Sequence, residues 1–128
     1  MVGDVNLGKG ASIWFGSIVK GDTGSINIGK NSILGDHSYV SDGSSIGDNV
    51  FVGSNTTIRG AKLESFSYIG SGVIIEKGAT VEQFGMLASG SHLAEGKTVP
   101  TGQVFAGAPA KYLRDTTTEE KHMISEYM

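Results

Sequence analysis

An aliphatic residue recurs every six positions along most of the chain. From residue 28 the series is Ile28, Leu34, Val40, Ile46, Val52, Ile58, Leu63, Ile69, Ile75, Val81, Leu87, Leu93, Val99 and Phe105, with one shorter step after Ile58. An earlier stretch has the same spacing at Leu7, Ile13 and Val19. This period fits neither the turn of an α-helix nor the two-residue alternation of a strand. It predicts a stack of identical short units.

Each unit begins with a large aliphatic residue, often has glycine second, and has a small or β-branched residue fifth, as in IGKNSI, IGDNVF and VGSNTT. We expect the first and fifth side chains to point inward and the Gly, Asp and Asn positions to form turns, some at positive φ. Three units would close one triangular coil of about 18 residues, and coils would stack by parallel strand pairing. The prediction is an all-β parallel β-helix over residues 1–108, followed by an extension over 109–128.

Two irregularities interrupt the repeat. The spacing lengthens between Val19 and Ile28, which predicts a small loop leaving one corner, and it shortens between Ile58 and Leu63, which predicts a tightened corner. Irregular corners of repeat proteins often mark a binding face, although a tolerated insertion or deletion explains them equally well.

The tail predicts a helix. Thr117 and Glu120 have the spacing of a capping box, which places a helix over residues 118–127. Ile124, Tyr127 and Met128 would form one apolar face of this helix. Because a short helix needs tertiary packing, we expect that face to lie along the solenoid or against a neighbouring subunit.

Composition narrows the function classes. The net charge is −3 and the basic residues are scattered, so neither a nucleic acid nor an anionic membrane is an expected partner. The absence of cysteine excludes disulfides and thiolate metal sites and leaves histidine and carboxylate as the metal ligands. No apolar run approaches the ~20 residues of a membrane span, so a transmembrane chain is not expected. The first residues resemble neither a signal peptide nor a transit peptide, so any presequence would precede them.

Three segments carry a family resemblance. GASIWFGSIVKGD, IGDNVFVGSNTTIRGA and VPTGQVFAGAPAKYLR resemble the γ-class carbonic anhydrases, including the γ-carbonic-anhydrase-like subunits of mitochondrial respiratory complex I. The third segment alone also resembles hexapeptide-repeat acyltransferases. The resemblance implies a left-handed β-helix with a C-terminal helix, assembled as a homotrimer or heterotrimer. In active members it implies a zinc ion between two subunits, held by three histidines, whose bound water attacks carbon dioxide.

The resemblance places the three zinc-ligand positions on Ser41, Ser54 and Arg59, within GDHSYVS and VGSNTTIRG. Ser41 and Arg59 are one coil apart, so we expect them at the same corner. Ser54 should lie on another edge, facing the pair of a neighbouring subunit. Neutral hydroxyls are poor zinc ligands, and a guanidinium has no lone pair to donate. No metal or other cofactor is therefore expected, with zinc only if partner chains supply the ligands.

Other positions that matter in the family are also altered. Lys20 takes the place of the arginine in the RGD turn usual in the family, which keeps its aspartate as Asp22, and Gly35 takes the place of a glutamine before Asp36. The resemblance gives these aspartates salt-bridge roles between subunits, whereas an acid/base pair is the alternative. The insertion that often carries proton-shuttle residues is missing, because the repeat runs unbroken from Val40.

The remaining histidines do not suggest a rebuilt metal site. His37 and His92 lie about three coils apart and His122 lies on the expected helix, so the three should not converge. Trp14 and Phe15 follow an inward position, and at least one of them should be exposed and covered by a subunit contact.

A sharper hypothesis concerns charge. Lys20 and Arg59 could form a small anion-binding cleft at the former zinc position, with Ser41 and Ser54 as hydrogen-bond donors.

The leading prediction is a non-catalytic structural or assembly subunit that forms a trimer with homologous chains in mitochondrial NADH:ubiquinone oxidoreductase (complex I), on the matrix side of the inner membrane. The alternatives are a carbonic anhydrase whose zinc ligands come from partner chains, and a hexapeptide acyltransferase with His37 or His92 as the general base. A small-molecule-binding trimer comes third, and a cytoplasmic location is the alternative to the mitochondrion.

Overall fold

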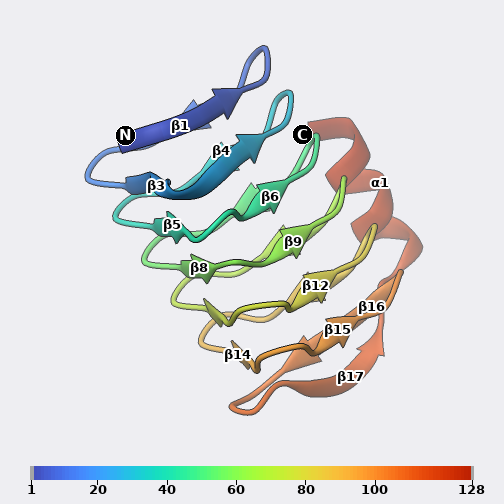
Figure 1. Cartoon of the computed structure of the whole chain (residues 1–128). Coiled ribbons are helices and arrows are strands. Elements are labelled where there is room, and N and C mark those ends of the chain that lie inside the picture. Colours follow the sequence, from blue (N-terminus) through green and yellow to red (C-terminus); the bar gives the residue numbers. More distant parts are fainter. Residues whose placement is uncertain (1, 128) are drawn as a thin grey trace.

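The computed structural model describes the backbone of residues 2–127 and the side chains of residues 3–123. Over this range the chain forms a parallel β-solenoid of stacked triangular coils that ends in one antiparallel strand and one helix (Figure 1). The predicted all-β parallel β-helix with a C-terminal helix is confirmed.

The coils present three faces. The first face consists of the start of β3 (Ile18–Ile28), β5 (Tyr39–Ser41), β8 (Thr57–Arg59), β11 (Ile74–Ile75) and β14 (His92–Leu93). The second face consists of β1 (Val2–Leu7), the end of β3, β6 (Ser45–Ile46), β9 (Lys62–Leu63), β12 (Thr80–Val81) and β15 (Thr98–Val99). The third face consists of β2 (Ser12–Ile13), β4 (Ile33–Leu34), β7 (Phe51–Val52), β10 (Tyr68–Ile69), β13 (Met86–Leu87), β16 (Gln103–Ala106) and the antiparallel β17 (Lys111–Asp115).

The core is the aliphatic column that the repeat predicts. Every member of the series from Val19 to Val99 is at most 3% exposed. The small fifth residues are buried beside it, and their hydroxyls are satisfied by the next coil, as when Ser38 Oγ donates to the Gly53 carbonyl at 3.0 Å. Leu7 departs from the prediction with 43% exposure, because it lies in the end coil, where no other described coil covers it.

Glycines play two distinct parts at the corners. The fourth position of the unit takes positive φ, as at Asn31 (59°) and Gly72 (68°). Second-position glycines are needed for close approach between coils instead. A Cβ added to Gly53 would lie 2.7 Å from the Ser71 nitrogen. The corner turns were therefore predicted correctly, but not the separate role of the second-position glycines.

The two irregular spacings have different outcomes. The extra residues after Val19 do not leave the solenoid as a loop. They form an irregularity inside the continuous strand β3, which pairs with β1 on both sides of it. The shortened spacing is a tightened corner, as predicted, because Gly60 turns with a φ of 62° directly after β8.

The tail contains one element that the sequence did not predict. After a turn with a cis Ala108–Pro109 bond, β17 returns antiparallel along β16. The helix α1 (Thr118–Tyr127) then runs back beside the corner that joins the second and third faces (Figure 1). No helix among the described residues is long and apolar enough to cross a membrane.

The start of α1 confirms the predicted capping box. The Thr117 nitrogen donates to Glu120 Oε1 at 2.9 Å, and the Glu120 nitrogen donates to Thr117 Oγ1 at 3.1 Å. Arg114 donates two further bonds to the Glu120 carboxylate at 2.7 and 2.9 Å. These bonds, that of Arg114 first, lower the pKa of Glu120 to about 2. The predicted apolar face lies outside the described side chains, because it comprises Ile124, Tyr127 and Met128.

Candidate functional site

The seven candidate residues lie at two corners of the solenoid. At the end of the first face, Lys20 pairs with Ser41 across β3 and β5, and Ser41 pairs with Arg59 across β5 and β8. These three residues, called here the cationic column, follow the inward positions and stack on successive coils. The sequence prediction that Ser41 and Arg59 share a corner is confirmed.

Ser41 is held firmly between the two cations. It is only 3% exposed, although it lies in a column with the half-buried Lys20 and the exposed Arg59. Its carbonyl accepts hydrogen bonds from Ser44 Oγ at 2.8 Å and from the Gly60 nitrogen at 2.9 Å. The backbone of the column is therefore fixed by the tightened corner.

Both cationic side chains of the column approach the aromatic ring of Tyr39. Lys20 Nζ lies 6.0 Å and Arg59 Cζ lies 5.9 Å from the centroid of the Tyr39 ring, which are cation–π distances. The sequence analysis missed this residue. The outward alternation of the strand places it on the surface of the first face, but the repeat contains no information about how long side chains fold over it.

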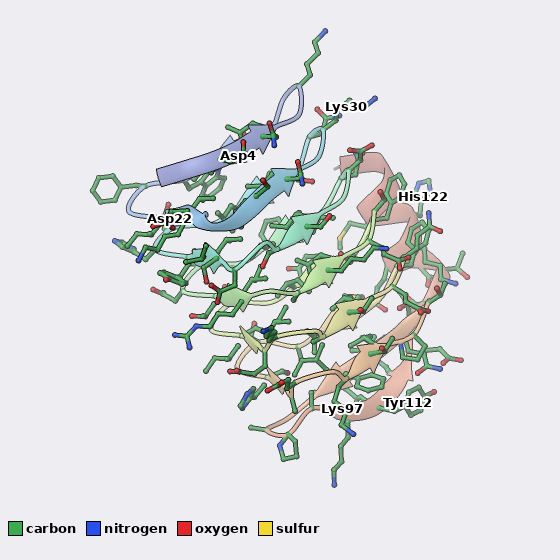
Figure 2. The ribbon with its side chains drawn as sticks, in the orientation of Figure 1. Asp4, Asp22, Lys30, Lys97, Tyr112 and His122 are labelled. Atoms are coloured by element: carbon green, nitrogen blue, oxygen red, sulfur yellow. The ribbon has the colours of Figure 1, made fainter. Side chains whose placement is uncertain are left out.

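Neither cation of the column has an ion pair within the described part of the chain. The ion pair there joins Arg114 to Glu120, and His92 Nε2 lies 3.5 Å from Glu76 Oε1, a contact that is an ion pair only with a protonated imidazole. Glu76 follows Ile75, the register partner of Ile58, and so stacks beside Arg59, but its carboxylate contacts His92 instead. Asp22 is exposed on β3 beyond the column (Figure 2).

Gly35, Asp36 and Ser54 lie at the other end of the first face, where it meets the third. The Asn55 nitrogen donates to the Asp36 carbonyl at 2.9 Å, which stacks the coil of Ser54 directly on that of Asp36. Gly35 is buried there, and a Cβ at this position would lie 2.8 Å from the Ser54 nitrogen. Within one chain, the width of the first face therefore separates Ser54 from the cationic column, as the sequence predicts.

The donor set at these corners does not fit zinc. The positions that the family resemblance assigns to the zinc ligands carry two serine hydroxyls and a guanidinium, and a guanidinium offers no lone pair. The described residues contain no group of three or more His, Cys, Asp or Glu side chains that could hold a metal ion.

The three histidines occupy separate places. His37 adopts a φ of 55° and packs edge-on against Phe15, with ring centroids 5.8 Å apart. His92 contacts Glu76 on the first face, and His122 lies on α1 at the edge of the solenoid opposite Asp22 (Figure 2). The described structure thus brings no two of them together.

Exposed apolar side chains gather on and beside the first face. Ile18 is 50% and Ile74 is 41% exposed on that face, and Trp14 and Phe15 are 49% and 81% exposed at the adjoining corner. The prediction that Trp14 or Phe15 points outward is confirmed for both. The sequence analysis did not single out Ile18 and Ile74, although their place next to an inward residue was the available signal.

Comparison with known proteins gives related and structurally similar chains. Family models described as bacterial transferase hexapeptide (six repeats) and hexapeptide repeat of succinyl-transferase match residues 25–60 and 43–82. The chain is 35% identical to gamma carbonic anhydrase 1, mitochondrial, of Arabidopsis thaliana, over 98% of this chain and 50% of that protein. It is 43% identical to gamma carbonic anhydrase 3, mitochondrial, of the same plant, over 96% of this chain and 52% of that protein. The chain thus spans about half the length of these relatives.

Two further matches cover most of both chains. The probable carbonic anhydrase of Methanocaldococcus jannaschii is 38% identical, over 98% of this chain and 82% of that protein. The crystal structure of a hexapeptide transferase family protein from Anaplasma phagocytophilum superimposes with a TM-score of 0.95 and 36% identity, over 98% of this chain and 77% of that chain.

Proposed function

The chain belongs to the γ-class carbonic anhydrase family, and from this premise we propose that it is a non-catalytic structural subunit that assembles as a trimer with homologous chains. The observation that carries the proposal is the cationic column. Ser41 is stacked directly on Arg59, and the family resemblance assigns this pair to the two zinc-ligand positions of one subunit. A permanent cation at this place repels a metal cation, and its charge cannot be removed near neutral pH.

The first face supports the assembly part of the proposal. Its exposed side chains include Ile18 and Ile74, with Tyr39 and Thr57 between them in register. Trp14 and Phe15 are exposed at the corner that also holds Gly35 and Asp36. Exposed apolar clusters of this kind are typical of protein contacts. A trimer that buries the first face would also bring the Ser54 corner of one subunit toward the cationic column of the next.

The proposal includes a location and a larger assembly. We propose a mitochondrial location for this chain, which the names of two relatives, both mitochondrial gamma carbonic anhydrases, support. Membership of complex I, on the matrix side of the inner membrane, is the finer part of this proposal and rests on the family resemblance of the sequence. Homologous subunits are its proposed direct partners. Native mass spectrometry of tagged complexes from the source organism tests this, and a tagged chain that co-purifies with no complex I subunit would overturn the placement.

The carbonic anhydrase alternative needs zinc ligands that this chain does not supply by itself. A carbonic anhydrase site would need partner chains that bring the missing histidines. A hexapeptide acyltransferase would use a histidine as general base, and His92, whose Nε2 lies 3.5 Å from Glu76 Oε1, is the candidate with a carboxylate partner. The matching family models are named after transferases, so the experiment below includes acetyl-coenzyme A binding among its outcomes.

The direct test measures zinc content and carbon dioxide hydration on the purified full chain, with subunit mass determined by light scattering. We expect a trimer with far less than one zinc ion per chain and no hydration above the uncatalysed rate. Stoichiometric zinc together with hydration activity would overturn the non-catalytic assignment. Saturable binding of acetyl-coenzyme A would favour the acyltransferase.

A further inference from the structure

The cationic column leaves two positive charges without a counter-ion at a well-ordered corner. Lys20 and Arg59 come from the strands on either side of the strand that carries Tyr39, and both approach its ring, so their charged groups are at most about 12 Å apart. No ion pair among the described residues neutralises either of them. Two like charges held over one ring repel each other, and a bound anion would relieve that repulsion.

We propose that Lys20, Ser41 and Arg59 form a binding site for a small oxyanion of the phosphate or carboxylate type. The inference rests on the proposed function, because it assigns a new ligand to the corner from which the zinc ligands are missing. It is specific to this chain, since it depends on the arginine at position 59 and not on the histidine of the family site.

The three side chains have complementary roles at such a site. The guanidinium of Arg59 offers a planar fork that binds two oxygens at once, and the ammonium of Lys20 supplies a mobile point charge. Two contacts of about 2.8 Å on either side of a phosphate span roughly 8 Å, which lies within the limit set by the Tyr39 ring. Ser41 lies between the two cations in register but is only 3% exposed, so its hydroxyl can donate only to an oxygen that enters between the Lys20 and Arg59 side chains.

Nearby carboxylates limit the affinity without occupying the site. Asp22 and Asp42 are exposed beyond the column, and Glu76 is drawn toward His92 at 3.5 Å. None of these carboxylates lies within 4.0 Å of Lys20 or Arg59 in the described chain. Their field weakens anion binding, and we expect dissociation constants on the order of 1 mM at low salt.

The experiment titrates the full chain with inorganic phosphate at low ionic strength and follows binding by phosphorus NMR line broadening and calorimetry. Arg59→Gln and Lys20→Gln should each weaken binding by about tenfold or more, the cost of losing a charged hydrogen-bond donor. Lys62→Gln is the matched control. Lys62 is an exposed lysine of the second face, and its replacement changes the net charge equally but should leave binding unchanged. Parallel titrations with acetate distinguish a carboxylate from a phosphate ligand.

Several results would overturn the proposal. These are the absence of saturable binding by either anion, or equal weakening by Lys62→Gln, which would indicate only a general effect of charge. A third is phosphate binding that appears only in the Asp36→Asn variant. That result would mean that the Asp36 carboxylate of a neighbouring subunit occupies the site in the unchanged protein. Zinc content measured on the same preparations separates the two proposals. A zinc-free chain that binds no phosphate contradicts only the anion site, and a chain that holds stoichiometric zinc contradicts the non-catalytic role.

Discussion

The separation of the family's ligand positions over two corners can be tested by restoring the ligands. Ser41→His and Arg59→His place two imidazoles on adjacent strands of one chain, and Ser54→His adds the third at the other corner. Adjacent strands lie about 4.8 Å apart, and two zinc-bound nitrogens at about 2.0–2.1 Å from the metal lie roughly 3.4 Å apart. Side chains on neighbouring strands can therefore share one zinc ion, whereas the third imidazole must come from another subunit.

The expected result is a zinc content that depends on assembly. The triple variant should bind about one zinc ion per chain, and only as a trimer, because its third ligand crosses the interface. The double variant Ser41→His, Arg59→His lacks the third ligand and should bind zinc more weakly. The loss of affinity should exceed the roughly 10- to 100-fold loss that follows removal of a residue hydrogen-bonded to a zinc ligand. Ser45→His with Lys62→His is the matched control, because these residues are also register partners but lie on the second face.

Mixed trimers sharpen the test. Each site would take two ligands from one chain and one from the next, so a single unchanged chain removes two of the three sites. Trimers with one unchanged chain should hold about one zinc ion, and trimers with two should hold none. The assay combines elemental analysis with competition against a chromogenic chelator on trimers separated by differently tagged chains. Zinc bound tightly by a monomeric triple variant, or equally by the double variant, would refute the placement of Ser54 at a separate corner.

The fold makes three further predictions. Leu63→Ala, at a position only 1% exposed, should lower the free energy of unfolding by about 2–5 kcal/mol in urea titrations, whereas Leu7→Ala, at 43% exposure, should cost far less. Gly53→Ala should be more destabilising in thermal melts than Gly72→Ala, because the first Cβ meets backbone 2.7 Å away and the second meets nothing within 4 Å, which leaves only the cost of about 1–2 kcal/mol for its φ of 68°. The pKa of Glu120 falls from 4.5 to about 2 on folding, so the ionised carboxylate stabilises the fold fully above about pH 4.5, and this stabilisation is lost as the pH falls toward 2. Circular dichroism should show the accompanying loss of helix. Glu120→Gln should abolish this pH dependence of the helix signal.

The repeat explains why so much of the fold was predictable. A period of six specifies which side chains enter the core, and counting in coils of 18 residues was enough to place Ser41 beside Arg59. The same count fails for Lys20, which pairs with Ser41 at a separation of 21, because the irregularity within β3 lengthens that coil. A local insertion shifts the register in a way that only the strand pairing reveals.

Other features were beyond the repeat for physical reasons. The strand β17 has no periodic signal, since all of its residues are exposed and its pairing depends on the turn that precedes it. The meeting of Lys20 and Arg59 over Tyr39 depends on the rotamers of long side chains, which sequence spacing does not determine.

The position of the cationic column also explains how such a protein can lose metal ligands and keep its fold. On three successive coils of the third face the residue after the inward aliphatic is Gly35, Gly53 or Gly70, and a Cβ at any of these three would meet the backbone of the next coil at less than 3.0 Å. The same position on the first face carries Lys20, Ser41 and Arg59. The corner of the first face therefore accommodates side chains, and they contribute nothing to the aliphatic column that buries the core. Substitution of the ligand residues leaves the inward residues and the strand pairing in place, so a chain of this fold can exchange metal chemistry for a scaffold role at little cost in stability.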